Sequence, residues 1–233
     1  MKPAAVKAAI FDCGGTLLEL QPSREAICAR VLAGLGRTVP PEFIRRAYYT
    51  ADFAMPHQSS RHADPAERQR YYDQYNQCLA VLLGVESLSP EFNSAMQDAF
   101  GRGAAHWRLI NGTAEALATF HDRFGLRQFV LANWDRHLRL RLQENGILHW
   151  FEDVGDSQTL GTEKPDRAIF DAFLQRVNVE PREAIYVGND YLADVVGSRR
   201  SGLFPVLLNR DGWYPSGCDC AVIGHLSELT QFL

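Results

Sequence analysis

Short apolar runs alternate with longer segments of helical periodicity over much of the chain. The runs at 6–11, 126–132, 184–187 and 205–208 are apolar at nearly every position, and two weaker ones lie near 151–154 and 220–223. Short runs that are apolar on both faces are typical of parallel strands buried between helices. Strands alternating with helices of 10 to 12 residues predict an α/β fold with a doubly wound, Rossmann-like parallel sheet.

A long segment after the first strand does not follow this alternation. From residue 22 to about residue 107 the apolar positions recur at helical spacing. Four helices are expected there, within 23–36, from residue 40 onward, within 64–84 and within 90–100. We therefore expect one core domain formed by residues 1–20 and 108–233. Residues 21–107 are expected to form a helical domain inserted into it.

Polar residues follow three of the predicted strands. Asp12 comes directly after the first strand, Asn133 after the strand at 126–132, and Asn189 after the strand at 184–187. The carboxyl ends of parallel strands are where ligands bind in such sheets, so these side chains are candidates for one site. Two acidic residues, Asp190 and Asp194, lie just beyond the third of these strands. Lys164 lies on a loop that precedes a predicted helix.

Composition excludes several classes of partner. The chain has 233 residues, 46% hydrophobic and 22% charged, with a net charge of −4. These are values of an ordinary globular protein, and nothing in them predicts binding to nucleic acid or to an anionic membrane. No apolar stretch is long enough to span a bilayer, and the first strand begins too early to leave room for a signal peptide. Five cysteines without a repeated spacing favour free thiols, so we expect a cytoplasmic protein.

Four segments, taken in this order, resemble the signature motifs of the haloacid dehalogenase superfamily of hydrolases. They are Asp12-Cys13-Gly14-Gly15-Thr16, Ala132-Asn133, Gly161-Thr162-Glu163-Lys164-Pro165, and Gly188-Asn189-Asp190 with Asp194. The resemblance covers almost the whole chain, and its specificity comes from the four segments together. It implies a Rossmann-like core and identifies the inserted helical domain as a cap that selects the substrate.

The resemblance also implies a role for each residue. Asp12 would be a nucleophile that forms a covalent aspartyl intermediate, and Lys164 would neutralise Asp12 and the substrate. The substrate would be a small anionic molecule, best described as a phosphoester. Phosphate-binding residues would be Gly15, Thr16, Ala132, Asn133 and Lys164. Magnesium would be held by Asp12, the Gly14 carbonyl, Asn189, Asp190 and Asp194, since this hard cation takes oxygen ligands.

Three positions depart from the pattern of the superfamily's phosphatases. Gly14 stands where an aspartate acts as general acid and base, and losing such a group typically costs about 10²–10⁴-fold in rate. Ala132 replaces a serine or threonine whose hydroxyl binds a phosphoryl oxygen. Asn189 replaces an aspartate, so it can offer an oxygen to a metal but no charge.

Three functions are compatible with this set of residues. The first, which we favour, is a magnesium-dependent phosphatase whose substrate has a stable leaving group or receives a proton from the cap. The second is a metal-independent 2-haloacid dehalogenase, because a halide leaves without a proton. The third is a catalytically impaired binding protein that keeps the fold. The cap candidates for a proton donor are His57, His62, Tyr71 and Tyr72. The sequence leaves the substrate's identity and a homodimer open.

Overall fold

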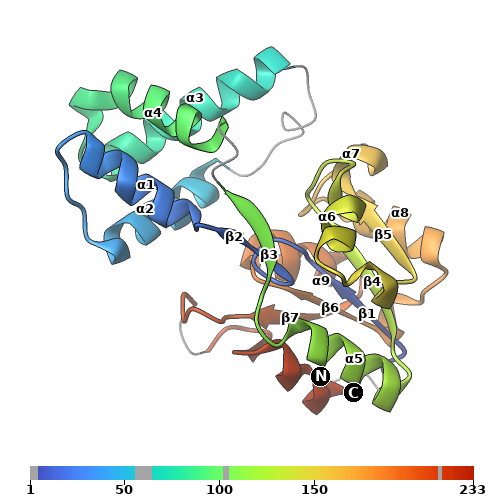
Figure 1. Ribbon diagram of the computed structural model, residues 1–233. Coiled ribbons are helices and arrows are strands. Elements are labelled where there is room, and N and C mark those ends of the chain that lie inside the picture. Colours follow the sequence, from blue (N-terminus) through green and yellow to red (C-terminus); the bar gives the residue numbers. More distant parts are fainter. Residues whose placement is uncertain (1–4, 56–64, 102–104, 215–216) are drawn as a thin grey trace. The chain divides into compact units, whose positions relative to one another are not determined.

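The computed structural model describes residues 5–55, 65–101, 105–214 and 217–233 (Figure 1). The chain divides into two compact units. One, the core unit, consists of Met1–Glu19 and Arg108–Leu233, and the other, the helical unit, consists of Leu20–Trp107. The two strands through which the chain leaves and re-enters the core unit are β2 (Leu18–Gln21) and β3 (His106–Leu109), which pair with each other.

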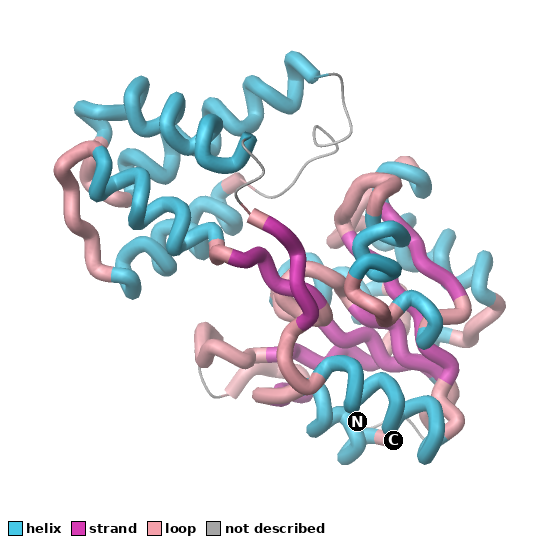
Figure 2. The backbone as a smooth tube through the Cα atoms, viewed as in Figure 1, coloured by secondary structure: helices cyan, strands magenta, loops and turns pink. Residues whose placement is uncertain are grey.

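A six-stranded sheet forms the centre of the core unit, and its strand order is β5-β4-β1-β6-β7-β8. All neighbouring strands are parallel, which confirms the predicted doubly wound α/β fold. Figure 2 shows the magenta strands of this sheet with cyan helices around them. The strands are β1 (Ala8–Phe11), β4 (Arg127–Ala132), β5 (Asp153–Asp156), β6 (Ala184–Gly188), β7 (Phe204–Leu208) and β8 (Ala221–Ile223). The strands β1, β4 and β6 are buried almost throughout, as their largely apolar sequences predicted.

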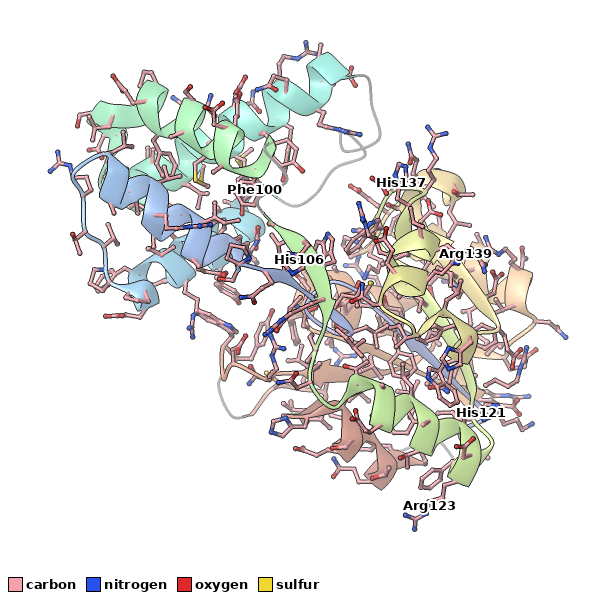
Figure 3. All side chains as sticks on the ribbon, viewed as in Figure 1. Phe100, His106, His121, Arg123, His137 and Arg139 are labelled. Carbon is pink, nitrogen blue, oxygen red and sulfur yellow. The ribbon has the colours of Figure 1, made fainter. Side chains whose placement is uncertain are left out.

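Helices connect the strands and cover the sheet. The α-helices of the core unit are α5 (Thr113–Phe124), α6 (Leu138–Glu144), α7 (Ser157–Leu160), α8 (Arg167–Val177) and α9 (Gly197–Arg200). Short 3-10 helices are η3 (Leu148–Trp150), η4 (Pro181–Glu183) and η6 (Leu226–Phe232), and η5 (Tyr191–Val196) is a π-helix. In Figure 3 the side chains of His121 and Arg123 mark the last turn of α5, where basic groups oppose the negative end of the helix dipole.

Side-chain alternation along β1 divides the core between the two faces of the sheet. Ile10 belongs to the buried cluster that contains Phe170 and Phe173 of α8. Phe11 points to the other face, where its ring stacks on Phe120 of α5 at a centroid distance of 6.2 Å. Successive residues of a strand point to opposite faces, so Asp12 continues the face of Ile10 towards α8.

The helical unit has an apolar core of its own. Its helices are α1 (Arg24–Gly34), α2 (Pro41–Ala54), α3 (Pro65–Leu82) and α4 (Ser89–Gly101), with the short 3-10 helix η2 (Glu86–Leu88) before α4. The buried cluster joins all four helices through residues such as Leu32, Tyr48, Leu79 and Phe92. In the part of the chain that the structure describes, no helix is long and apolar enough to cross a membrane.

Local structure differs from the sequence prediction at three places. The sequence analysis missed the strands β2 and β3. Each has only four residues, and apart from the first residue of β2 none of them is fully buried, so neither forms an apolar run. Helical apolar spacing also predicts an α-helix over 192–201, a segment that the structure forms as the π-helix η5 followed by α9. It likewise predicts an α-helix over 225–232, where the structure has the 3-10 helix η6. Patterns of apolar spacing do not separate these helix types over so few residues.

Candidate active site

The carboxyl end of β1 meets the loop that precedes α8. Asp12 directly follows β1, and Lys164 lies three residues before α8 begins at Arg167. Because this face of β1 packs against α8, the two side chains approach each other although 152 residues separate them. Lys164 is only 3% exposed and Asp12 8% exposed. The resemblance implied that Lys164 turns inward to neutralise Asp12, and the structure places the two side chains in contact in the protein interior.

The ammonium of Lys164 donates three hydrogen bonds. Its Nζ lies 2.7 Å from Oδ1 of Asp12, 2.6 Å from Oδ1 of Asp194 and 2.9 Å from the Tyr186 hydroxyl. An ammonium has three protons, so these partners use its full donor capacity. Burying a lysine is costly unless it is paired in this way, which explains why the cation is stable inside the protein.

Charges within this buried cluster shift the pKa of its members. Burial alone would lower the pKa of Lys164, but the Asp12 and Asp194 carboxylates outweigh it and hold this pKa well above its ordinary value. Burial raises the pKa of Asp12 to about 6, Lys164 opposes this rise, and the like charge of Asp194 adds to it. The cluster therefore contains a permanent cation and a carboxylate that ionises close to neutral pH.

Asn133 has a different position from the one expected for a substrate donor. Its Nδ2 donates to the Lys164 carbonyl at 2.9 Å, and its Oδ1 accepts from the Lys164 amide at 2.8 Å. The side chain thus binds both sides of one residue's backbone, as a neighbouring strand would. Asn133 connects the end of β4 to the loop that carries the lysine, and one amide proton remains for other partners.

Thr16, on the loop after β1, lies between Asp12 and Asn189, the residue that follows β6. The Thr16 Oγ1 lies 3.4 Å from Oδ2 of Asp12 and 3.1 Å from Oδ1 of Asn189. Gly15 has a φ of +83°, and a Cβ at this position would lie 2.7 Å from Nδ2 of Asn189. Glycine is therefore required at position 15 both for its backbone conformation and for the close approach of the asparagine.

The two acidic residues after β6 are occupied by internal contacts. Asp194 is 1% exposed; its Oδ1 accepts from Lys164, and its Oδ2 accepts from the Asp190 amide at 2.8 Å. Oδ1 of Asp190 accepts from the Ala193 amide at 2.7 Å and caps the π-helix η5. Both carboxylates shape the turn at the end of β6, and that of Asp194 also holds the lysine.

The oxygen atoms nearest to the free side of Asp12 suit a hard cation in kind. In the described residues, no three carboxylate, histidine or cysteine groups form a metal site. Oδ2 of Asp12 and Oδ1 of Asn189 nevertheless converge, since both lie within reach of one hydroxyl, that of Thr16. Magnesium in enzymes is commonly held by one or two carboxylates together with water and substrate phosphates. One carboxylate and one amide oxygen are compatible with that mode of binding.

Two further positions at the strand ends lack polar side chains in the site. Ala132 at the end of β4 is buried and offers no hydroxyl, as its sequence predicted. Cys13 is also buried, and β-strand alternation directs it away from the face of Asp12. Burial and the neighbouring Asp12 charge hold the pKa of its thiol well above the ordinary value, which disfavours a thiolate nucleophile.

Tyr186 is the member of the cluster that the sequence analysis missed. It lies in the middle of β6, where a tyrosine in an apolar run is easily taken for a packing residue. The signal was its hydroxyl, because a buried tyrosine O–H needs a hydrogen-bond partner. Of the proposed proton donors in the helical unit, His57 and His62 lie outside the described residues, and the Tyr71 hydroxyl donates to the Met55 carbonyl at 3.1 Å.

Comparisons with known proteins identify the family. The model of the haloacid dehalogenase-like hydrolase family matches residues 6–202. The chain belongs to this family. It is 30% identical over 210 residues to the human haloacid dehalogenase-like hydrolase domain-containing protein 3, covering 87% of this chain and 82% of that protein. The resemblance stated from the four motifs is thereby confirmed.

Two further proteins are similar to this chain. The glyceraldehyde 3-phosphate phosphatase of Methanothermobacter thermautotrophicus is 32% identical over 122 residues, which cover 47% of this chain and 52% of that protein. A crystal structure of the HAD-hydrolase YfnB of Bacillus subtilis, bound to magnesium, superimposes with a TM-score of 0.69 at 19% identity. That match covers 98% of this chain and 99% of YfnB, and it shows a common fold.

Proposed function

We propose that this hydrolase is a phosphatase that removes a phosphoryl group from a small anionic substrate through an aspartyl-phosphate on Asp12. The observation that carries the proposal is the buried Asp12 carboxylate, whose Oδ1 lies 2.7 Å from the Lys164 ammonium at the carboxyl edge of the sheet. The phosphatase named among its relatives supports transfer of a phosphoryl group rather than the dehalogenase reaction.

The reaction would take place at the Asp12 carboxylate, which Lys164 orients through Oδ1. One carboxylate oxygen would attack phosphorus, and the other would serve the metal. The bond from phosphorus to the leaving oxygen breaks, and the leaving group departs with the electron pair. Water then attacks the phosphorus of the aspartyl-phosphate, and the bond between phosphorus and the Asp12 oxygen breaks. Inorganic phosphate leaves with the oxygen of that water, its released proton passes to solvent, and the Asp12 carboxylate is restored. A carboxylate is a weak nucleophile, and correct orientation by a fixed cation raises its effectiveness.

Charge is balanced by Lys164 and, in this proposal, by magnesium. Lys164 holds Asp12 in one orientation and offsets the negative charge that accumulates in the site. We assign Asp12, Asn189 and the Gly14 carbonyl to the metal, because Oδ2 of Asp12 and Oδ1 of Asn189 both lie within reach of the Thr16 hydroxyl, whereas both oxygens of Asp194 accept from Lys164 and the Asp190 amide. Magnesium bound there would neutralise charge on the phosphoryl oxygens.

Gly14 restricts the substrates that this site can use. The core residues in contact with Asp12 are Thr16 and Lys164, and the lysine's protons are held by fixed acceptors. A leaving alkoxide would therefore gain no proton from them. An acyl phosphate or an aryl phosphate leaves as a stable anion, so these are the substrates that we expect to react fastest.

The test measures inorganic phosphate released from acetyl phosphate, p-nitrophenyl phosphate and glycerol phosphate, with magnesium and with EDTA. We expect magnesium-dependent release in the order acetyl, p-nitrophenyl, glycerol, and a loss of at least about 10³-fold in Asp12→Asn. Cys13→Ala is the matched control, since it changes the neighbouring buried residue and leaves the carboxylate in place. Its rate should equal that of the unsubstituted protein.

Two outcomes would replace this function. Chloride released from chloroacetate at a rate indifferent to EDTA would favour the dehalogenase, a reaction that the glycine at position 14 also permits. No release from any substrate would favour a binding protein. In that case Gly14→Asp with Ala132→Ser tests whether the scaffold is competent, because the pair restores a proton donor and a hydroxyl at the strand ends.

A further inference from the structure

Tyr186 occupies a position in the cluster that packing does not explain. Its hydroxyl accepts from the Lys164 ammonium at 2.9 Å and donates to the Leu131 carbonyl at 2.7 Å. β1 lies between β6 and β4, so this side chain crosses from one neighbour of β1 to the other. The carbonyl it binds lies one residue beyond the last pair of the β1–β4 ladder, Phe11 with Val130.

The end of β4 contacts Lys164 in a second way, through the lysine's backbone. Leu131 precedes Ala132 and Asn133, and Asn133 binds the Lys164 backbone through both its amide oxygen and its amide nitrogen. The end of β4 therefore fixes the lysine's backbone through Asn133 and its ammonium through Tyr186. Fixing both ends of a flexible side chain removes most of the positions that its ammonium could take.

We propose that Tyr186 is a positioning residue, which holds the third proton of Lys164 so that the ammonium serves Asp12 and Asp194 as a fixed charge. The ring is itself held, because it packs edge-on against Phe170 of α8 at a centroid distance of 5.2 Å. In this arrangement Lys164 orients the nucleophile as a fixed charge.

Tyr186→Phe tests the proposal, since it removes one hydroxyl and keeps the ring. The kinetic arm rests on the proposed function. We expect kcat for acetyl phosphate to fall about 10- to 100-fold, the range for one hydrogen bond to a charged group. KM and the inhibition constant for inorganic phosphate should change less than about threefold, because Tyr186 does not contact the substrate. Tyr191→Phe is the matched control, which removes a hydroxyl bonded to Asp219 at 2.6 Å in the same unit.

A second measurement does not depend on turnover. In protein labelled with ¹⁵N at lysine, the buried Lys164 ammonium should give a slowly exchanging NMR signal, assigned by its loss in Lys164→Met. The signal should shift and exchange faster in Tyr186→Phe and stay unchanged in Tyr191→Phe. Its absence from the unsubstituted protein, or an unchanged signal in Tyr186→Phe, would overturn the inference. Failure to release phosphate with a normal signal would count against the proposed function alone.

The kinetic result separates positioning from packing. If Tyr186→Phe lowers Tm and its loss of activity equals its loss of folded protein, then kcat per folded molecule is unchanged. That result would mean that the residue contributes only to packing. A rise in the inhibition constant for phosphate that matches the loss in kcat would mean that Tyr186 contacts the ligand. Either result would overturn the positioning role.

Discussion

The two oxygens of Asp12 lie in different surroundings. Oδ1 is bound to the Lys164 ammonium, whereas Oδ2 faces the Thr16 hydroxyl at the longer distance of 3.4 Å. A carboxylate held through one oxygen keeps a defined orientation while the other oxygen stays available. Burial nevertheless raises the pKa of Asp12, and the like charge of Asp194, which shares the same cation, raises it further. The nucleophile is thus well oriented, but in the metal-free protein it is mostly ionised only above a pH of about 6.

The pKa of Asp12 should be measurable directly. In metal-free protein we expect its side-chain carboxyl ¹³C signal to titrate with a midpoint of about 6 instead of the ordinary 3.8. The protonated form cannot attack phosphorus, so in the metal-free protein the fraction that carries an ionised Asp12 falls about tenfold per pH unit well below this midpoint. Asp194→Asn removes a like charge and should lower the midpoint. A midpoint near 4 in the unsubstituted protein would contradict the buried arrangement.

Each member of the cluster comes from a different element. Asp12 follows β1, Tyr186 lies on β6, Asp194 on η5, and Lys164 on the loop before α8. Apolar runs and strand ends are local signals, so the sequence predicted the strands of the core sheet and their common edge. The pairing of the aspartate with the lysine was implied only by the resemblance to the superfamily. The sequence did not predict the partners of Tyr186 or Asn133. Those depend on the register between distant strands, which no local pattern contains.

Glycine at the end of β6 makes the cluster possible. A Cβ on Gly188 would lie 2.2 Å from the Asp194 carboxyl group, so Gly188→Ala should displace Asp194 and with it the lysine. We expect a loss of about 1–3 kcal/mol in the free energy of unfolding, measured by urea denaturation, and a fall in kcat well beyond the loss of folded protein.

Gly155→Ala on β5 is the control for that substitution. Its Cβ would lie 2.6 Å from the Phe173 ring, so it causes comparable overpacking away from Asp194. It should lower stability by a similar amount while kcat per folded molecule stays near that of the unsubstituted protein. Equal effects of the two alanines on kcat would mean that Gly188 is needed for packing alone.

All the residues assigned to the site belong to the core unit. Its boundary is reinforced by Glu19 on β2, which binds Arg108 of β3 at 2.6 Å and Arg210 at 3.0 Å. The helical unit buries a separate apolar cluster, so neither unit depends on the other for its own core. We propose that the core unit carries the chemistry and that the helical unit selects the substrate.

Replacing residues 22–105 with a short Gly/Ser linker tests this division. Because the sheet, the lysine cluster and the Glu19 ion pairs lie within the core unit, the shortened protein should fold, as followed by circular dichroism and by its urea transition. It should still accept a phosphoryl group from acetyl phosphate, with the same dependence on Asp12, but lose its preference among larger phosphoesters. Asp12→Asn in the shortened protein gives the background rate. A shortened protein that is unfolded, or that keeps the full selectivity, would show that the two parts do not divide the work in this way.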